Sequence, residues 1–155
     1  MTTIQNFQKI RRDGKVIYES MKVKDLIALG WQPDIIVELQ WSFGSKLISL
    51  TSKYGFSAKV VPGREFVAIM EDIDQSTRVC SMYIVNSDGS RRFEISNMQR
   101  IGDAEVEGEF RWFEPARLDS AHVFGAVFCR RTDDALFQMD IDAASGRVIG
   151  VYPTR

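Results

Sequence analysis

Residues 122–142 of this chain read HVFGAVFCRRTDDALFQMDID. In the second half of this stretch, Phe137, Met139 and Ile141 alternate with polar residues, so these apolar side chains point to one face of a strand. The polar residues 131–134 suit a tight turn, and an apolar run precedes them. The stretch therefore predicts two antiparallel strands joined by a hairpin turn.

The same succession of short apolar runs and polar turns continues over residues 57–155. Turn residues recur there at short, regular intervals, which is typical of an antiparallel meander and not of alternating strands and helices. One face of this sheet is expected to be apolar and covered, and the other face to contact water. The strands that we predict are 57–61, 66–71, 79–86, 91–97, 106–113, 122–130, 135–142 and 147–152.

Residues 1–56 have a different pattern. The apolar runs Ile4–Ile10 and Val16–Glu19 flank an Asp-Gly pair and predict a hairpin. Apolar residues at helical spacing then predict a short helix over Met21–Leu29 and a longer one from about Asp34 to Tyr54. The longer helix has opposing signals, because it contains a β-branched run near its start and a glycine in its middle.

These patterns together predict an α+β fold, in which two helices of the N-terminal half pack on a curved antiparallel meander of about six to eight strands. The chain has 155 residues, of which 45% are hydrophobic and 26% are charged. Such a length and composition are those of one globular domain, which we expect to span residues 1–155.

The charge balance argues against general nucleic-acid binding. A formal net charge of −1 lacks the basic surplus that phosphate contacts require. Repeated aromatic residues that could stack on bases are also missing. Phe110 and Trp112 come nearest to such a pair, but two residues of the same strand that are two positions apart are expected on its core face.

The sequence lacks the signals of export, of membrane insertion and of metal or redox sites. No apolar N-terminal segment resembles a signal peptide, and no apolar run is long enough to cross a membrane. Cys80 and Cys129 stand singly in apolar runs, without the close spacing of a redox or zinc pair. We therefore expect a cytoplasmic protein with two buried free thiols, no metal and no cofactor.

His122 is the only histidine of the chain, which excludes chemistry that needs two imidazoles. Ser120 lies two residues before it, on the same face if the segment is a strand, and Asp119 or Asp140 could orient the ring as in a catalytic triad. The simpler interpretation is a polar residue at the start of a strand. The alternative is a small hydrolase or nuclease that uses His122 with a nearby carboxylate or arginine.

A row of carboxylates lies on the predicted strand 106–113 and just before it. Acidic residues alternate there with small or apolar ones, so that four carboxylates line one face. Their mutual repulsion must be offset by solvent, by neighbouring arginines or by a basic partner. Either a solvated edge strand or a protein-binding face has this pattern. The candidate partner-binding residues are Asp103, Glu105, Glu107, Glu109 and Arg111.

With an acidic strand and no recognisable catalytic motif, the chain resembles bacterial toxin-immunity proteins, including those of contact-dependent growth-inhibition systems. The resemblance implies a small, non-catalytic, cytoplasmic protein that binds and blocks one protein partner, such as a basic toxin or nuclease domain. It implies neither nucleic acid nor membrane as a partner. A ligand-binding or scaffold domain is a further alternative, which would show a deep apolar pocket.

Overall fold

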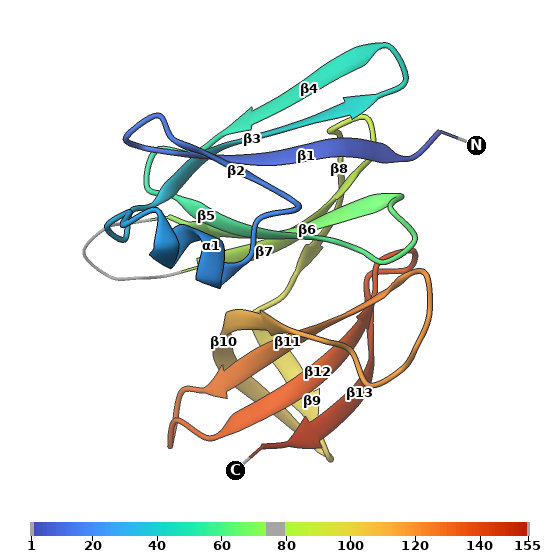
Figure 1. Cartoon of the computed structure of the whole chain (residues 1–155). Helices are drawn as coiled ribbons and strands as arrows, with labels where there is room; N and C mark the ends of the chain where they lie inside the picture. The colour runs from blue at the N-terminus through green and yellow to red at the C-terminus, as the bar shows by residue number, and fades with distance from the viewer. Residues whose placement is uncertain (1, 74–79, 155) are drawn as a thin grey trace.

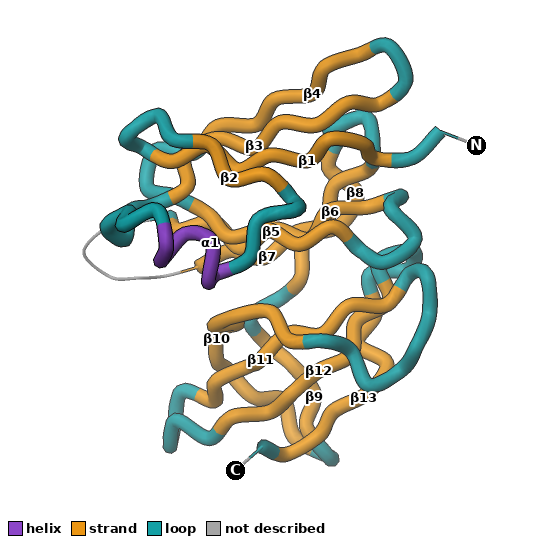
Figure 2. The backbone as a smooth tube through the Cα atoms, viewed as in Figure 1, coloured by secondary structure: helices purple, strands orange, loops and turns teal. Residues whose placement is uncertain are grey.

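The computed structural model describes residues 2–73 and 80–154 of the chain. These residues form thirteen strands and one short helix, all strands pairing antiparallel (Figures 1 and 2). The elements in chain order are β1 (Ile4–Arg11), β2 (Val16–Tyr18), α1 (Val23–Ala28), β3 (Ile36–Phe43), β4 (Lys46–Thr51), β5 (Phe56–Val60), β6 (Phe66–Asp72), β7 (Cys80–Asn86), β8 (Arg91–Ile95), β9 (Met98–Ile101), β10 (Ala104–Glu114), β11 (Val123–Arg130), β12 (Leu136–Asp142) and β13 (Arg147–Pro153).

The strands make three sheets that lie one above another in Figure 1. The N-terminal sheet has the order β2-β1-β3-β4, the middle sheet β5-β6-β7-β8 and the C-terminal sheet β13-β12-β11-β10-β9. Consecutive strands are neighbours almost throughout, as in a meander; the exception is β1, which lies between β2 and β3. Each sheet is therefore formed by one continuous part of the chain: β1–β4, then β5–β8, then β9–β13.

The middle sheet is buried on both faces. In β6, Phe66, Ala68 and Met70 belong to the core shared with the C-terminal sheet, whereas Val67 and Ile69 belong to the core shared with the N-terminal sheet. Because both faces are covered, β6 reads as a continuous apolar run and not as an alternation. A sheet, and not a pair of helices, thus covers each face.

The prediction of an α+β fold with two packed helices is wrong. Residues 36–51 form the hairpin of β3 and β4, in which Phe43 pairs with Lys46 across a two-residue turn. Gly44 occupies this turn with a φ of +61°, a conformation that favours glycine and interrupts a helix. The helix expected over Met21–Leu29 shortens to α1, which buries none of its residues.

The other predicted elements correspond to strands of the structure. The N-terminal hairpin is β1 and β2, and the eight strands expected after residue 57 coincide with β5–β8 and β10–β13. Residue 79, the first of the predicted strand 79–86, lies outside the described residues. The sequence reasoning missed β9. Within the described ranges, no helix is long and apolar enough to cross a membrane.

Candidate functional site

The acidic residues singled out in the sequence lie on β10 and in the turn before it. Asp103 belongs to the turn between β9 and β10, whereas Glu105 and Glu107 are exposed on the strand. Glu109 is half-buried, and the next residue, Phe110, is buried in the core between the middle and C-terminal sheets. The expected alternation therefore holds over this part of β10, which presents its glutamates to the outside.

An arginine lies beside each of these glutamates. Arg131 Nη1 lies 2.6 Å from Glu107 Oε1, and Arg111 Nη2 lies 3.0 Å from Glu109 Oε1. Glu105 is paired in register with Arg100 of β9. The repulsion within the row is thus offset inside the chain, and the surface is a ladder of opposite charges. Exposed pairs of this kind contribute little to stability.

The alternation along β10 changes at Arg111. Phe110 pairs with Phe128 of β11 but Trp112 pairs with Val127, so that Arg111 is the extra residue of a β-bulge. The bulge moves Trp112 to the outer face, where 43% of its surface is exposed and its Nε1–H donates to Glu114 Oε1 at 2.8 Å. The expectation that Trp112 shares the core face with Phe110 is therefore wrong.

The residues of the alternative catalytic site, His122, Ser120 and Asp119, are not arranged as a catalytic triad requires. The carboxylate beside His122 is Glu65, whose Oε2 lies 3.4 Å from Nδ1, and the imidazole and the Phe66 ring pack edge to face. Ser120 Oγ accepts a bond from the backbone N–H of His122 at 3.4 Å. In residues 2–73 and 80–154, no hydrogen bond joins the imidazole to Asp119 or to Asp140. The Asp140 carboxylate instead accepts the backbone N–H groups of Arg117 and Leu118. Glu65 escaped sequence reasoning because it belongs to a different hairpin.

The two cysteines are free, with Cys129 buried and Cys80 half-buried. Burial raises the pKa of the Cys80 thiol to about 12, and the negative charges of Asp72, Glu109 and Glu71 add to the effect. A thiol with this pKa is protonated near neutral pH and is a poor nucleophile. Within the part of the chain that the structure describes, no three His, Cys, Asp or Glu residues could hold a metal ion.

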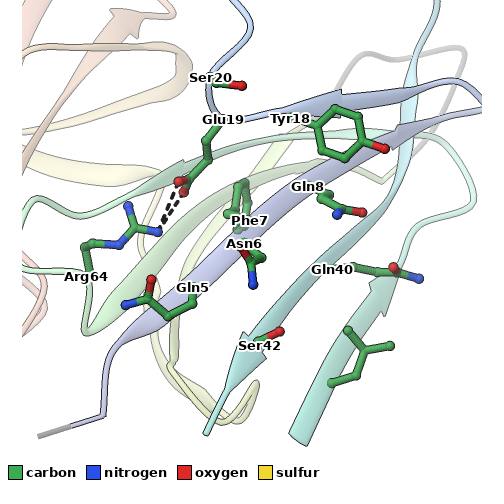
Figure 3. Close-up of a pocket in the computed structure, with 11 residues that line it drawn as sticks. Gln5, Asn6, Phe7, Gln8, Tyr18, Glu19, Ser20, Gln40, Ser42 and Arg64 are labelled. Carbon is green, nitrogen blue, oxygen red and sulfur yellow. Dashed lines mark hydrogen bonds and ion pairs between the residues drawn. The ribbon is translucent and has the colours of Figure 1, made fainter. Parts of the chain in front are cut away.

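A basin of about 660 Å³ lies on the N-terminal sheet (Figure 3). Among the described residues that line it, Glu19 and Arg64 carry a charge, and Arg64 Nη2 lies 2.9 and 3.1 Å from the two carboxylate oxygens of Glu19. Such a surface can offer neutral hydrogen bonds, and it is open and largely polar, unlike the deep apolar pocket expected of a ligand-binding domain. The residues that line it are Gln5, Asn6, Phe7, Gln8, Tyr18, Glu19, Ser20, Gln40, Ser42, Leu47 and Arg64.

Comparison with family models found no match, and comparison with curated proteins found none either. A solved structure does match. One chain of the structure of Tne2 in complex with Tni2 is similar to this chain with a TM-score of 0.94 and 36% sequence identity, over 98% of this chain and 99% of that chain. The similarity thus extends over the whole of both chains, in sequence as well as in fold.

Proposed function

Because the chain belongs to the same family as the chain that it matches in the Tne2–Tni2 complex, we propose that it is a protein-binding module, an immunity protein or inhibitor that blocks a toxin or enzyme. The observation that carries this proposal is the full-length match, at 36% identity, to a chain of a two-protein complex. The comparison does not single out contact-dependent growth-inhibition systems, so the proposal is the broader immunity or inhibitor class.

The proposed binding surface is the outer side of β10, with the turn before it. Its residues are Asp103, Glu105, Glu107, Glu109 and Arg111. A basic toxin or nuclease domain would place its cations against these glutamates in competition with the arginines already beside them. Charges of this kind chiefly speed association and select the partner. We further propose that the protein acts in the cytoplasm.

The experiment uses the purified product of the gene next to that of this chain as the partner. We expect a complex in isothermal titration calorimetry, and we expect the chain to restore growth to cells that produce the partner. The absence of both effects would refute the proposal.

The acidic strand is tested with the double variant Glu105→Lys and Glu107→Lys, both at exposed positions. The matched control is the double variant Asp88→Lys and Glu94→Lys. Both residues are exposed on the middle sheet or its turn, and the two substitutions change the net charge by the same amount. Slower association and a different salt dependence are expected for the first variant only. If both variants associate with the partner at the same rate, the acidic strand is not part of the interface.

A further inference from the structure

A loop crosses the outer face of the C-terminal sheet between β10 and β11. This segment, residues 115–121, is called the Arg117 loop below. The row beneath its start consists of Gly125, Asp140 and Gly150, which are neighbours in register on β11, β12 and β13. A Cβ atom at Gly125 would lie 2.5 Å from the carbonyl oxygen of Glu114. The sheet therefore carries glycine where the chain must approach it closely.

Asp140 holds the Arg117 loop from below, although it is a charged residue with only 1% of its surface exposed. Its Oδ1 accepts the backbone N–H of Arg117 at 3.0 Å, and its Oδ2 accepts that of Leu118 at 2.9 Å. Gln138 Nε2–H donates to the carbonyl oxygen of Pro115 at 2.8 Å. A buried carboxylate is tolerated only when it is hydrogen-bonded, and these bonds fix the loop before any partner arrives.

The loop presents side chains that suit an interface. The Arg117 guanidinium lies over the Tyr152 ring, 4.3 Å from its centroid, and Leu118 is 51% exposed. Trp112 belongs to the same outer face, because its row runs in register through Val127 and Gln138 to Tyr152. Tryptophan, tyrosine and arginine are the residues that most often dominate binding energy at protein interfaces.

We infer that Trp112, Arg117, Leu118 and Tyr152, the aromatic patch, form the centre of the partner interface, with the charged ladder of β10 as its rim. This inference rests on the proposed function. The patch is continuous with the proposed surface, since Trp112 directly follows Arg111 on β10. The charges of the ladder are already paired and exposed, so they contribute little binding free energy. The Arg117 loop is already held in place, so binding through it costs little conformational entropy.

The occupant is an apolar segment of the partner protein that carries a carboxylate. Leu118 and Trp112 offer the apolar contact. Among residues 2–73 and 80–154, no carboxylate lies within 4.0 Å of the Arg117 guanidinium. A guanidinium that lies over an aromatic ring and has no carboxylate beside it can donate to a carboxylate of the partner in a bidentate pair.

The test measures the affinity of the same purified gene product for variants of the patch. Leu118→Asp is expected to weaken binding at least tenfold, and the milder Leu118→Ala several-fold. The matched control is Leu47→Asp on β4, where the side chain is 68% exposed, and its affinity should equal that of the wild type. Circular dichroism melts confirm that each variant is folded.

The charge of the occupant is tested with Arg117→Glu, which is expected to weaken binding at least tenfold. Unchanged or tighter binding would show that the occupant carries no carboxylate there. If the wild type binds and both Leu118 variants bind equally well, the aromatic patch is not the centre of the interface, although the proposed function stands. If the wild type does not bind, this inference falls, and if the wild type also fails to restore growth, the proposed function falls with it.

Discussion

Asp140→Asn is the change that most directly tests how the Arg117 loop is held. Asparagine has nearly the same shape as aspartate, so that the packing between Gly125 and Gly150 is kept. It differs in having one acceptor oxygen where the carboxylate has two. One of the two amide groups, Arg117 N–H or Leu118 N–H, would then face an NH₂ group instead of an oxygen.

The magnitude follows from the lost bond. A hydrogen bond to a charged group contributes about 1.5–3 kcal/mol, and we expect a loss of unfolding free energy in this range. The loss stays moderate for two reasons: a neutral amide is less costly to bury than a carboxylate, and the loop can lift to give its amide groups to water. In a protein of this size each kcal/mol lowers Tm by about 2–4 °C, so the expected decrease is about 3–12 °C.

The assay combines thermal melts with hydrogen exchange. The amide protons of Arg117 and Leu118 should exchange faster in Asp140→Asn than in the wild type, while those of the middle sheet stay protected. The control is Asp119→Asn, the same change at an exposed position of the loop. A change in Tm below about 1 °C together with unchanged exchange would refute the view that Asp140 holds the loop.

Two further predictions concern a turn and a thiol. Gly146 has a φ of +76°, and a Cβ atom there would lie 2.7 Å from Phe93 Cγ; Gly146→Ala should therefore cost about 2–5 kcal/mol in urea unfolding. Gly102→Ala, with a φ of +63° but open space around it, should cost only about 1–2 kcal/mol, and equal losses would contradict the packing argument. Because the pKa of Cys80 is raised to about 12, its alkylation by iodoacetamide at pH 8 should be slow in the folded protein and fast in urea. Rapid labelling of the folded protein would show that the thiol is not shielded.

Apart from β9, the strands of the C-terminal half could be predicted because each of them has a local sequence pattern. Phe137, Met139 and Ile141 alternate with polar residues, and turn residues separate the runs. The N-terminal half misled the same reasoning. Leu39 and Leu50 fit a helical spacing, but they also lie on the inner face of β3 and β4, where both pack in the core shared with the middle sheet. Periodicity over a few residues did not separate these two patterns.

Tertiary contacts decided between them. The pairing of β1 with β3, and the bond from Trp41 Nε1–H to the carbonyl oxygen of Ser87 at 2.7 Å, join residues that are far apart in the chain. No local signal reports such contacts. They supply partners for the backbone groups of β3 and for the indole nitrogen of the buried Trp41, so the segment becomes a strand in spite of its helical spacing.

The sequence by itself determined that the chain is rich in antiparallel strands, that its only histidine is His122, and that carboxylates alternate along the strand around Glu107. Only the tertiary structure decided what surrounds these groups. It placed arginines beside the glutamates, Glu65 beside the imidazole and Asp140 beneath a loop. A single bulge turned Trp112 outward. The physical reason is that register and bulges depend on pairing between distant segments, whereas alternation depends on the segment alone.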